Sequence, residues 1–331
     1  MLAAALAAAP NGLANAAEAG GASNCTSKTG ALNVTDLPSG TSVVDCGFVG
    51  RVVSFDGRRL TIPPAGEGVG VEAILVSGGT SGFHVEVSST GTISYDVTGE
   101  QQSSSSASTS AFTYAVDDED FDDTSDAGVT STSACSDGAH SGEDLMEYDT
   151  YNWYVGDGAM PGAMTQSEAH TAFADAINNI TGSYNNCGYS DTVSATAAYQ
   201  GTTTYEADIN SSGDCTDRDG KSTWDAGNLD SGTVAETCWW DTSYLGMEND
   251  LKEADVRYNT TDLDFTNSPT SSCTSKYDIR SVGTHEAGHV FGLGHVGSGH
   301  SNLTMYTNSF LCSTKARTLG KGDILGLRDI Y

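Results

Sequence analysis

The 331-residue chain is long enough for two domains, each with a hydrophobic core of its own. It carries 14 Lys and Arg against 44 Asp and Glu, a formal net charge of −30 at pH 7. A charge of this sign repels phosphate backbones and anionic membrane surfaces, so nucleic acid is excluded as an expected partner.

The first residues have the pattern of a secretory signal. The apolar run Leu2 to Pro10 is shorter than the roughly 20 residues that span a bilayer, and no later apolar run is longer. Ala14-Asn15-Ala16 follows, with the small residues typical of a signal cleavage site. We therefore predict a signal peptide over 1–18, no transmembrane segment, and a secreted, extracellular protein. The eight cysteines fit that location, because oxidising compartments preserve disulfides.

A small all-β domain is predicted over residues 25–100, where short β-rich runs alternate with turn residues. Asp56-Gly57 between two such runs predicts a hairpin. Residues 101–143 are rich in Ser and Asp and hold too little apolar surface to fold alone, which predicts an acidic linker. Two roles stay open for 25–100. It is a pro-segment that covers a cleft and is removed by a cut in the linker, which we favour, or a binding module that stays attached.

From 144 to 331 the pattern is mixed α and β. Thr165-Gln166-Ser167-Glu168 is a capping box followed by apolar residues at helical spacing, which predicts a first helix. A second helix is predicted to begin near Asp278, whose side chain can cap it, and a last helix covers Asp323 to Tyr331.

The second predicted helix carries the chemistry, in the run His285-Glu286-Ala287-Gly288-His289-Val290-Phe291-Gly292-Leu293-Gly294-His295. His285 and His289 are one helical turn apart, so both imidazoles leave one face and can bind one zinc ion. Gly292 can take a positive φ and end the helix, which lets the chain turn back and present His295 as the third ligand. Three imidazoles leave a fourth position open, as a catalytic zinc site requires. Glu286 follows the first ligand and is predicted to be the general base that takes a proton from the zinc-bound water.

This motif resembles the signature of the metzincin metalloproteases, and the chain is most similar to the matrixins among them. Met305 stands where that family has the methionine of its Met-turn, a hydrophobic floor beneath the zinc. Asp278 to Val282 resembles the start of the matrixin active-site helix, and Asp323 to Tyr331 resembles the matrixin terminal helix. The resemblance covers about 147–331. It implies an α+β catalytic domain over 144–331, with a mixed twisted sheet and three helices.

A substrate site is also implied by the resemblance. Residues 233–240 stand where matrixins have an edge strand, so Ala235, Glu236 and Thr237 are expected to pair with the backbone of an extended peptide. The implied protein is a secreted zinc endopeptidase with one catalytic Zn²⁺, which acts as a monomer on protein or peptide substrates.

One alternative belongs to another class: a secreted, calcium-dependent surface or adhesion protein with a catalytically inactive zinc site. It fits the composition but does not explain why Glu286, Gly292 and Met305 stand at the spacing from the three histidines that the metzincin signature requires. Asp217 and Asp219 lie in an oxygen-rich loop and are candidate Ca²⁺ ligands, against a solvated turn.

The cysteines allow many pairings, and sequence alone does not choose among them. The pairs we expect are Cys25 with Cys46, Cys215 with Cys238, and Cys273 with Cys312, which leaves Cys135 for Cys187.

Overall fold

The structure is a computed structural model, and it describes residues 25, 30–37, 40–98, 132–215, 217–244, 247–306 and 311–331. The predicted signal peptide and most of the predicted linker lie outside the described residues. Within the described residues, no helix is both long and apolar enough to cross a membrane.

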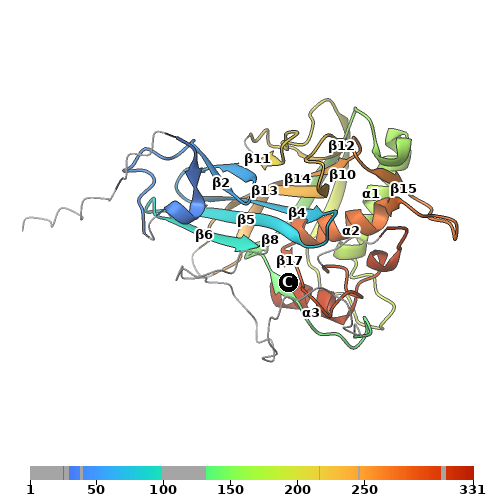
Figure 1. Cartoon of the computed structure of the whole chain (residues 1–331). Helices are drawn as coiled ribbons and strands as arrows, with labels where there is room; N and C mark the ends of the chain where they lie inside the picture. Colours follow the sequence, from blue (N-terminus) through green and yellow to red (C-terminus); the bar gives the residue numbers. More distant parts are fainter. Residues whose placement is uncertain are drawn as a thin grey trace, which may run out of the picture.

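One large mixed sheet organises the molecule (Figure 1). Neighbouring strands pair in parallel from the first strand of the sheet order to the fourth, and in antiparallel from there to the last. In spatial order the strands are β10 (Thr196–Thr203), β9 (Thr150–Gly156), β12 (Ser222–Gly227), β14 (Asn249–Asn259), β13 (Thr233–Thr242), β4 (Glu67–Leu75), β5 (Thr80–Val87) and β6 (Ile93–Thr98), and β8 (Leu145–Met146) pairs with β14.

Smaller elements surround this sheet. A second sheet contains β1 (Leu32–Asn33), β2 (Val52–Phe55), β3 (Arg58–Thr61) and β11 (Asp214–Cys215), and two short ladders join β15 (Asp264–Thr266) to β16 (Lys276–Asp278) and β17 (Leu293–Gly294) to β7 (Ser141–Gly142). Short 3₁₀ turns cover Val34–Asp36, Pro161–Ala163 and Lys315–Arg317. The predicted hairpin is confirmed, because β2 and β3 pair across Asp56 and Gly57, both at positive φ.

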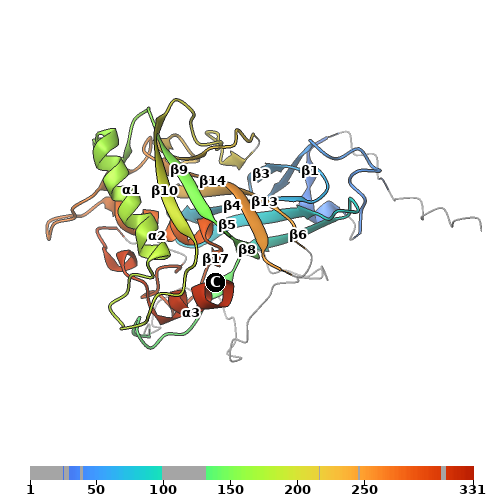
Figure 2. The ribbon, with the colours of Figure 1, turned by 180° about the vertical axis from the view of Figure 1, so that it is seen from behind.

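The α-helices of the described residues flank the large sheet, with two at the end of the molecule opposite the amino-terminal strands and the last below the sheet (Figures 1 and 2). They are α1 (Gln166–Thr181), α2 (Ile279–Val290) and α3 (Lys321–Ile330). The predicted capping box begins α1, where Thr165 and Glu168 exchange bonds, and Asp278 caps α2 by accepting from the backbone of Ser281. The expected α+β fold, with three helices and a mixed sheet, is confirmed.

Two hydrophobic cores lie on the two faces of the sheet. The core beneath the helices packs Phe173 of α1 against the rings of Trp224 and Tyr258, with centroids 5.3 and 5.4 Å away. The second core joins the amino-terminal strands to the other face of β13, where Cys238 and Trp240 are buried among side chains of β1 to β6. The strand-rich character of 25–100 is therefore present, and its strands β4 to β6 continue the large sheet formed by strands of residues 145–259. The domain boundaries remain predictions.

The expectation of a free edge at Ala235, Glu236 and Thr237 is wrong for the intact chain. These residues lie in β13, which pairs with β14 on one side and antiparallel with β4 on the other. The edge is filled because β4 provides a matching ladder and buries its apolar side chains in the second core. A peptide cannot pair with β13 while β4 holds this place.

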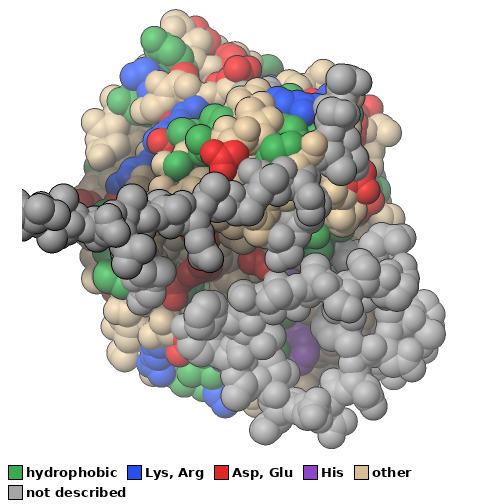
Figure 3. Space-filling view, turned by 90° about the vertical axis from the view of Figure 1, so that its left-hand side faces the viewer, with side chains coloured by type: hydrophobic (Ala, Val, Ile, Leu, Met, Phe, Trp, Pro, Cys, Tyr) green, Lys and Arg blue, Asp and Glu red, His purple; other side chains and the backbone are tan. Residues whose placement is uncertain are grey.

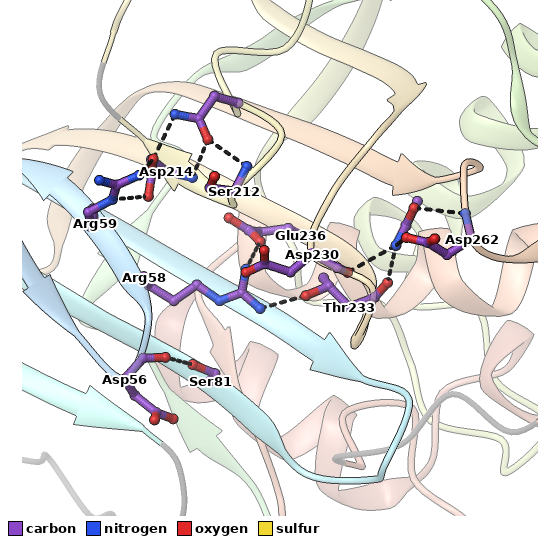
Figure 4. A network of polar contacts seen from close by, with 12 residues as sticks. Asp56, Arg58, Arg59, Ser81, Ser212, Asp214, Asp230, Thr233, Glu236 and Asp262 are labelled. Carbon is purple, nitrogen blue, oxygen red and sulfur yellow. Dashed lines mark hydrogen bonds and ion pairs between the residues drawn. The ribbon is translucent and has the colours of Figure 1, made fainter.

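Buried charges also join the amino-terminal segment to the rest of the chain (Figure 4). Arg58 Nη1 donates to Glu236 Oε2 over 2.6 Å, and Arg58 Nη2 donates to Thr233 Oγ1 over 2.6 Å. Both charged side chains are buried, with 3 % of Arg58 and none of Glu236 exposed. The neighbouring Arg59 forms two bonds with Asp214. Figure 3 shows small groups of Lys and Arg over the upper part of this end of the molecule, although the chain as a whole is strongly acidic.

A buried histidine, His84 of β5, forms a further ion pair with β13. Its Nε2 lies 2.8 Å from Asp241 Oδ2, and its ring stacks on Trp239. Burial alone lowers the pKa of His84, but the charge and hydrogen bond of Asp241, with Glu86 and Asp96, outweigh burial and raise that pKa to about 9.

All four expected disulfides are present: Cys25–Cys46, Cys135–Cys187, Cys215–Cys238 and Cys273–Cys312. The third links β11 to β13, and the fourth links the loop before α2 to the segment after Met305.

Candidate metal centre

The three motif histidines converge on one point. His285 and His289 leave the same face of α2, and Gly292, with φ of 88°, ends the helix and turns the chain back toward them. His295 then faces the helix. The Nε2 atoms of the three rings lie 2.8 Å (His285 to His295), 3.0 Å (His289 to His295) and 3.2 Å (His285 to His289) apart.

The hydrogen bonds of these rings fix which nitrogen is protonated. His285 Nδ1 donates to the carbonyl of Thr304 over 2.8 Å, and His289 Nδ1 donates to the carbonyl of Leu293 over 3.0 Å. Burial, followed by repulsion from His295, lowers the pKa of His285 to about 3, and burial lowers the pKa of His295 to about 3. Neutral rings that donate from Nδ1 have their lone pairs on Nε2. These three lone pairs face and repel one another, and a bound cation would remove that repulsion. The donor set fits zinc, which prefers imidazole nitrogen and keeps one position open in catalytic sites.

Glu286 lies beside this point and is fully buried. Thr237 of β13, also fully buried, donates its hydroxyl to Glu286 Oε2 over 2.6 Å. Burial raises the pKa of Glu286 to about 8, and the Thr237 hydrogen bond opposes part of that rise. Of the three predicted substrate-strand residues, Thr237 therefore reaches the site, whereas Glu236 points to the opposite face and pairs with Arg58.

Met305 lies directly under the motif helix, because a Cβ built at Gly288 would meet the Met305 thioether. Its backbone is held by Asp323 in the first turn of α3. Asp323 accepts from the backbone nitrogens of Thr304 (3.0 Å), Met305 (3.2 Å) and Gly320 (2.7 Å). The last helix thus fixes the carbonyl of Thr304 that orients His285.

Sequence reasoning missed three acidic residues around the centre. Asp323 is signalled only by its place in the first turn of the last helix. Glu72 of β4 places Oε2 3.2 Å from His295 Nδ1, and Glu143 places Oε1 3.9 Å from His289 Nδ1. Nothing local in the sequence marks Glu72 or Glu143, because both approach the histidines only through the fold.

The two candidate calcium residues do not lie in one cluster. Asp219 joins Asp208 and Glu253, with one carboxylate oxygen of each within 4.8 Å of the others, whereas Asp217 is outside this group. The backbone nitrogens of Asp219 and Gly220 both donate to Glu253.

The family comparison agrees with this geometry. The matrixin family model matches residues 120–331, which cover the predicted catalytic domain and all three histidines. A search of curated proteins found no match to the chain. The match covers well over half of the sequence, and the chain belongs to the matrixin family, a family of metalloproteases.

Proposed function

We propose that this protein is a zinc-dependent endopeptidase that uses Glu286 as its general base. The observation that carries the proposal is the convergence of three neutral Nε2 atoms beside a buried carboxylate. His285, His289 and His295 would hold one zinc ion, and Met305 would form the floor beneath it. The match to the matrixin family supports the same reaction class.

A bound zinc would supply Lewis acidity, which acidifies a water molecule and polarises the scissile carbonyl. Glu286 takes the proton from the attacking water, because its carboxylate is next to the first ligand. In the described structure it has no Lys or Arg partner, which would lower its basicity. The same carboxyl then gives a proton to the leaving amine as the peptide bond breaks. Thr237 orients Glu286 by donating to one of its oxygens, which leaves the other oxygen for proton transfer.

The alternative, a surface protein with an inactive zinc site, requires the ligand set without the base. The buried Glu286 and its 2.6 Å bond to Thr237 support the catalytic proposal over that alternative. The test is cleavage of a general protein substrate by the purified chain, with and without a zinc chelator, beside Glu286→Gln at matched zinc content. General acid–base catalysis contributes about 10²- to 10⁴-fold, so the variant is expected to lose activity by that factor. Bound zinc with equal activity in both proteins would refute the role of Glu286. Bound zinc without any cleavage, also after a cut between β6 and β7 that allows β4 to leave the edge of β13, would favour the alternative.

Secretion is part of the proposal. The four disulfides support an oxidising location, and the sequence pattern of 1–18 supports export. The amino-terminal sequence of the protein recovered from the medium tests both points, since a chain that begins at Met1 would contradict the signal peptide.

Calcium binding at Asp219 is a further proposal, supported by its grouping with Asp208 and Glu253. Titration calorimetry of Ca²⁺ against the native chain and Asp219→Asn tests it. Equal heats in the two proteins would rule out this cluster.

For the amino-terminal segment, we propose that it stays bound to the catalytic part. The shared core and the buried Arg58–Glu236 pair support this, because loss of the segment would expose Glu236, Cys238 and Trp240. The test is a cut between β6 and β7 in the folded chain, followed by the cleavage assay. A marked rise in activity would favour a removable pro-segment, because the edge of β13 would then be free.

A further inference from the structure

The three histidines of the centre differ in what holds the far side of each ring. His285 and His289 donate from Nδ1 to backbone carbonyls of Thr304 and Leu293, which belong to the same part of the chain. His295 Nδ1 faces a carboxylate instead, Oε2 of Glu72, at the ion-pair distance of 3.2 Å. The third ring therefore takes its outer contact from the amino-terminal strands.

The position of Glu72 is built into the strand register. Glu72 lies in β4 directly opposite Thr237 of β13, the residue that donates to Glu286, and only 1 % of Glu72 is exposed. On its other side it faces Gly82 of β5. A Cβ at Gly82 would lie 2.5 Å from the carboxyl carbon of Glu72, so glycine there leaves the space that the carboxyl group fills.

We infer that Glu72 is a positioning residue for the metal centre, acting through His295. A carboxylate that accepts from Nδ1–H fixes the ring tautomer and orientation and makes Nε2 a stronger donor to a metal. Partners of this kind typically contribute about 10- to 100-fold in metal affinity. The inference rests on the proposed zinc site, and it adds a residue that lies outside the matrixin match over 120–331.

Glu143 provides the matched control. It is also a largely buried carboxylate near the centre, but its nearest ring nitrogen, His289 Nδ1, is 3.9 Å away and already donates to the carbonyl of Leu293. Glu72→Gln and Glu143→Gln therefore make the same substitution beside the centre, and only the first changes the outer contact of a ligand histidine.

The experiment measures zinc affinity of the full chain by competition with a chromophoric chelator, for the native protein, Glu72→Gln, Glu72→Ala and Glu143→Gln. The visible spectrum of the Co²⁺-loaded proteins is a second readout, because it reports the ligand field of the histidines. We expect Glu72→Ala to bind zinc about 10- to 100-fold more weakly and to show a shifted cobalt spectrum. Glu72→Gln should fall between Glu72→Ala and the native protein, because its amide oxygen is an acceptor for Nδ1 but carries no charge. Glu143→Gln should keep the native spectrum.

Several outcomes would overturn the inference. Unchanged zinc affinity in folded Glu72→Gln and Glu72→Ala would show that His295 needs no carboxylate partner. Equal losses of zinc affinity in Glu72→Gln and Glu143→Gln would show that any carboxyl group near the centre has this effect, and not the contact with His295. If Glu72→Ala does not fold, as judged by circular dichroism, the zinc affinity and cobalt spectrum of the near-isosteric Glu72→Gln test the inference alone. A native chain that binds no zinc at all would refute the proposed function itself, and this result is obtained before any variant is compared.

Discussion

Replacing Arg58 by Met should destabilise the protein by an amount that depends strongly on pH. Arg58 is the cation within 2.6 Å of the fully buried Glu236, and the substitution keeps the aliphatic volume but removes the charge and both hydrogen bonds. Removing one partner of a buried ion pair typically costs about 3–5 kcal/mol, because the other charge stays buried.

The pH dependence follows from Glu236. Burial raises the pKa of this carboxyl to about 7, from an ordinary 4.5, although Arg58 opposes the rise. A folded pKa above the unfolded one means that stability is lost as pH rises from about 4.5 through 7. Without Arg58 the folded pKa rises further, so the loss continues to higher pH in the variant. At pH 5, where Glu236 is protonated in both proteins, only the hydrogen bonds are lost, at about 1–3 kcal/mol. At pH 9 the full cost of about 3–5 kcal/mol applies.

The assay is urea unfolding of the intact chain, followed by tryptophan fluorescence at pH 5 and pH 9. Salt is kept high and constant, because the net charge of −30 makes every removal of a cation costly at low ionic strength. Arg51→Met is the control for lost positive charge, since Arg51 donates to the carbonyl of Gly30 at an exposed position and lies over the ring of Phe48, and its replacement should cost about 1 kcal/mol at either pH. The double variant Arg58→Met/Glu236→Gln should lose the pH dependence. A loss for Arg58→Met that is below about 1 kcal/mol, or equal at the two pH values, would refute the reasoning.

Three further predictions concern the centre and its supports. The native protein should lose up to about 3 kcal/mol of stability relative to His84→Gln as pH rises from 6.5 to 9, measured by urea unfolding. The folded pKa of His84 lies above its unfolded value, so the stabilising charge of His84 is lost through that window. A stability difference that does not change with pH would contradict the ion pair with Asp241. Asp323→Asn should cost about 1–3 kcal/mol in the same assay, because an amide oxygen cannot replace two carboxylate oxygens that accept three backbone N–H groups, whereas a neutral result would mean that α3 does not hold the Met-turn. Chelation of zinc should lower the calorimetric melting midpoint, since a ligand present at a thousand times its Kd stabilises the folded state by about 4 kcal/mol. The melting midpoint of His289→Gln should change much less when the chelator is added. Equal changes in the two proteins would show that the chelated metal binds elsewhere.

The helices and the zinc motif could be predicted because their information is local. A capping box specifies the start of α1, and the spacing of His285 and His289 places two rings on one face of any helix that contains them. Gly292 signals the turn that returns His295, since few residues other than glycine take its positive φ at low cost.

The contacts that could not be predicted are non-local. The sequence marks 25–100 as rich in strands, but strand propensity does not say which strands will pair, so the placement of β4 beside β13 was missed. Glu72 and Arg58 depend on that pairing, because each acts on a residue far away in the sequence. The same pairing explains the error at Ala235 to Thr237, where a resemblance to matrixins implies a free edge and this chain fills it with a strand of its own.

The distribution of the disulfides makes the protein a potential two-chain complex. Cys25–Cys46 closes within the segment before β6 ends, and the other three bonds close within 135–312. A single cut between Thr98 and Thr132 would leave no covalent link between the two pieces, so their association would obey mass action and weaken on dilution. Dissociation would free the edge of β13 and remove Glu72 from His295 at the same moment, which couples access to the site and retention of the metal to protein concentration.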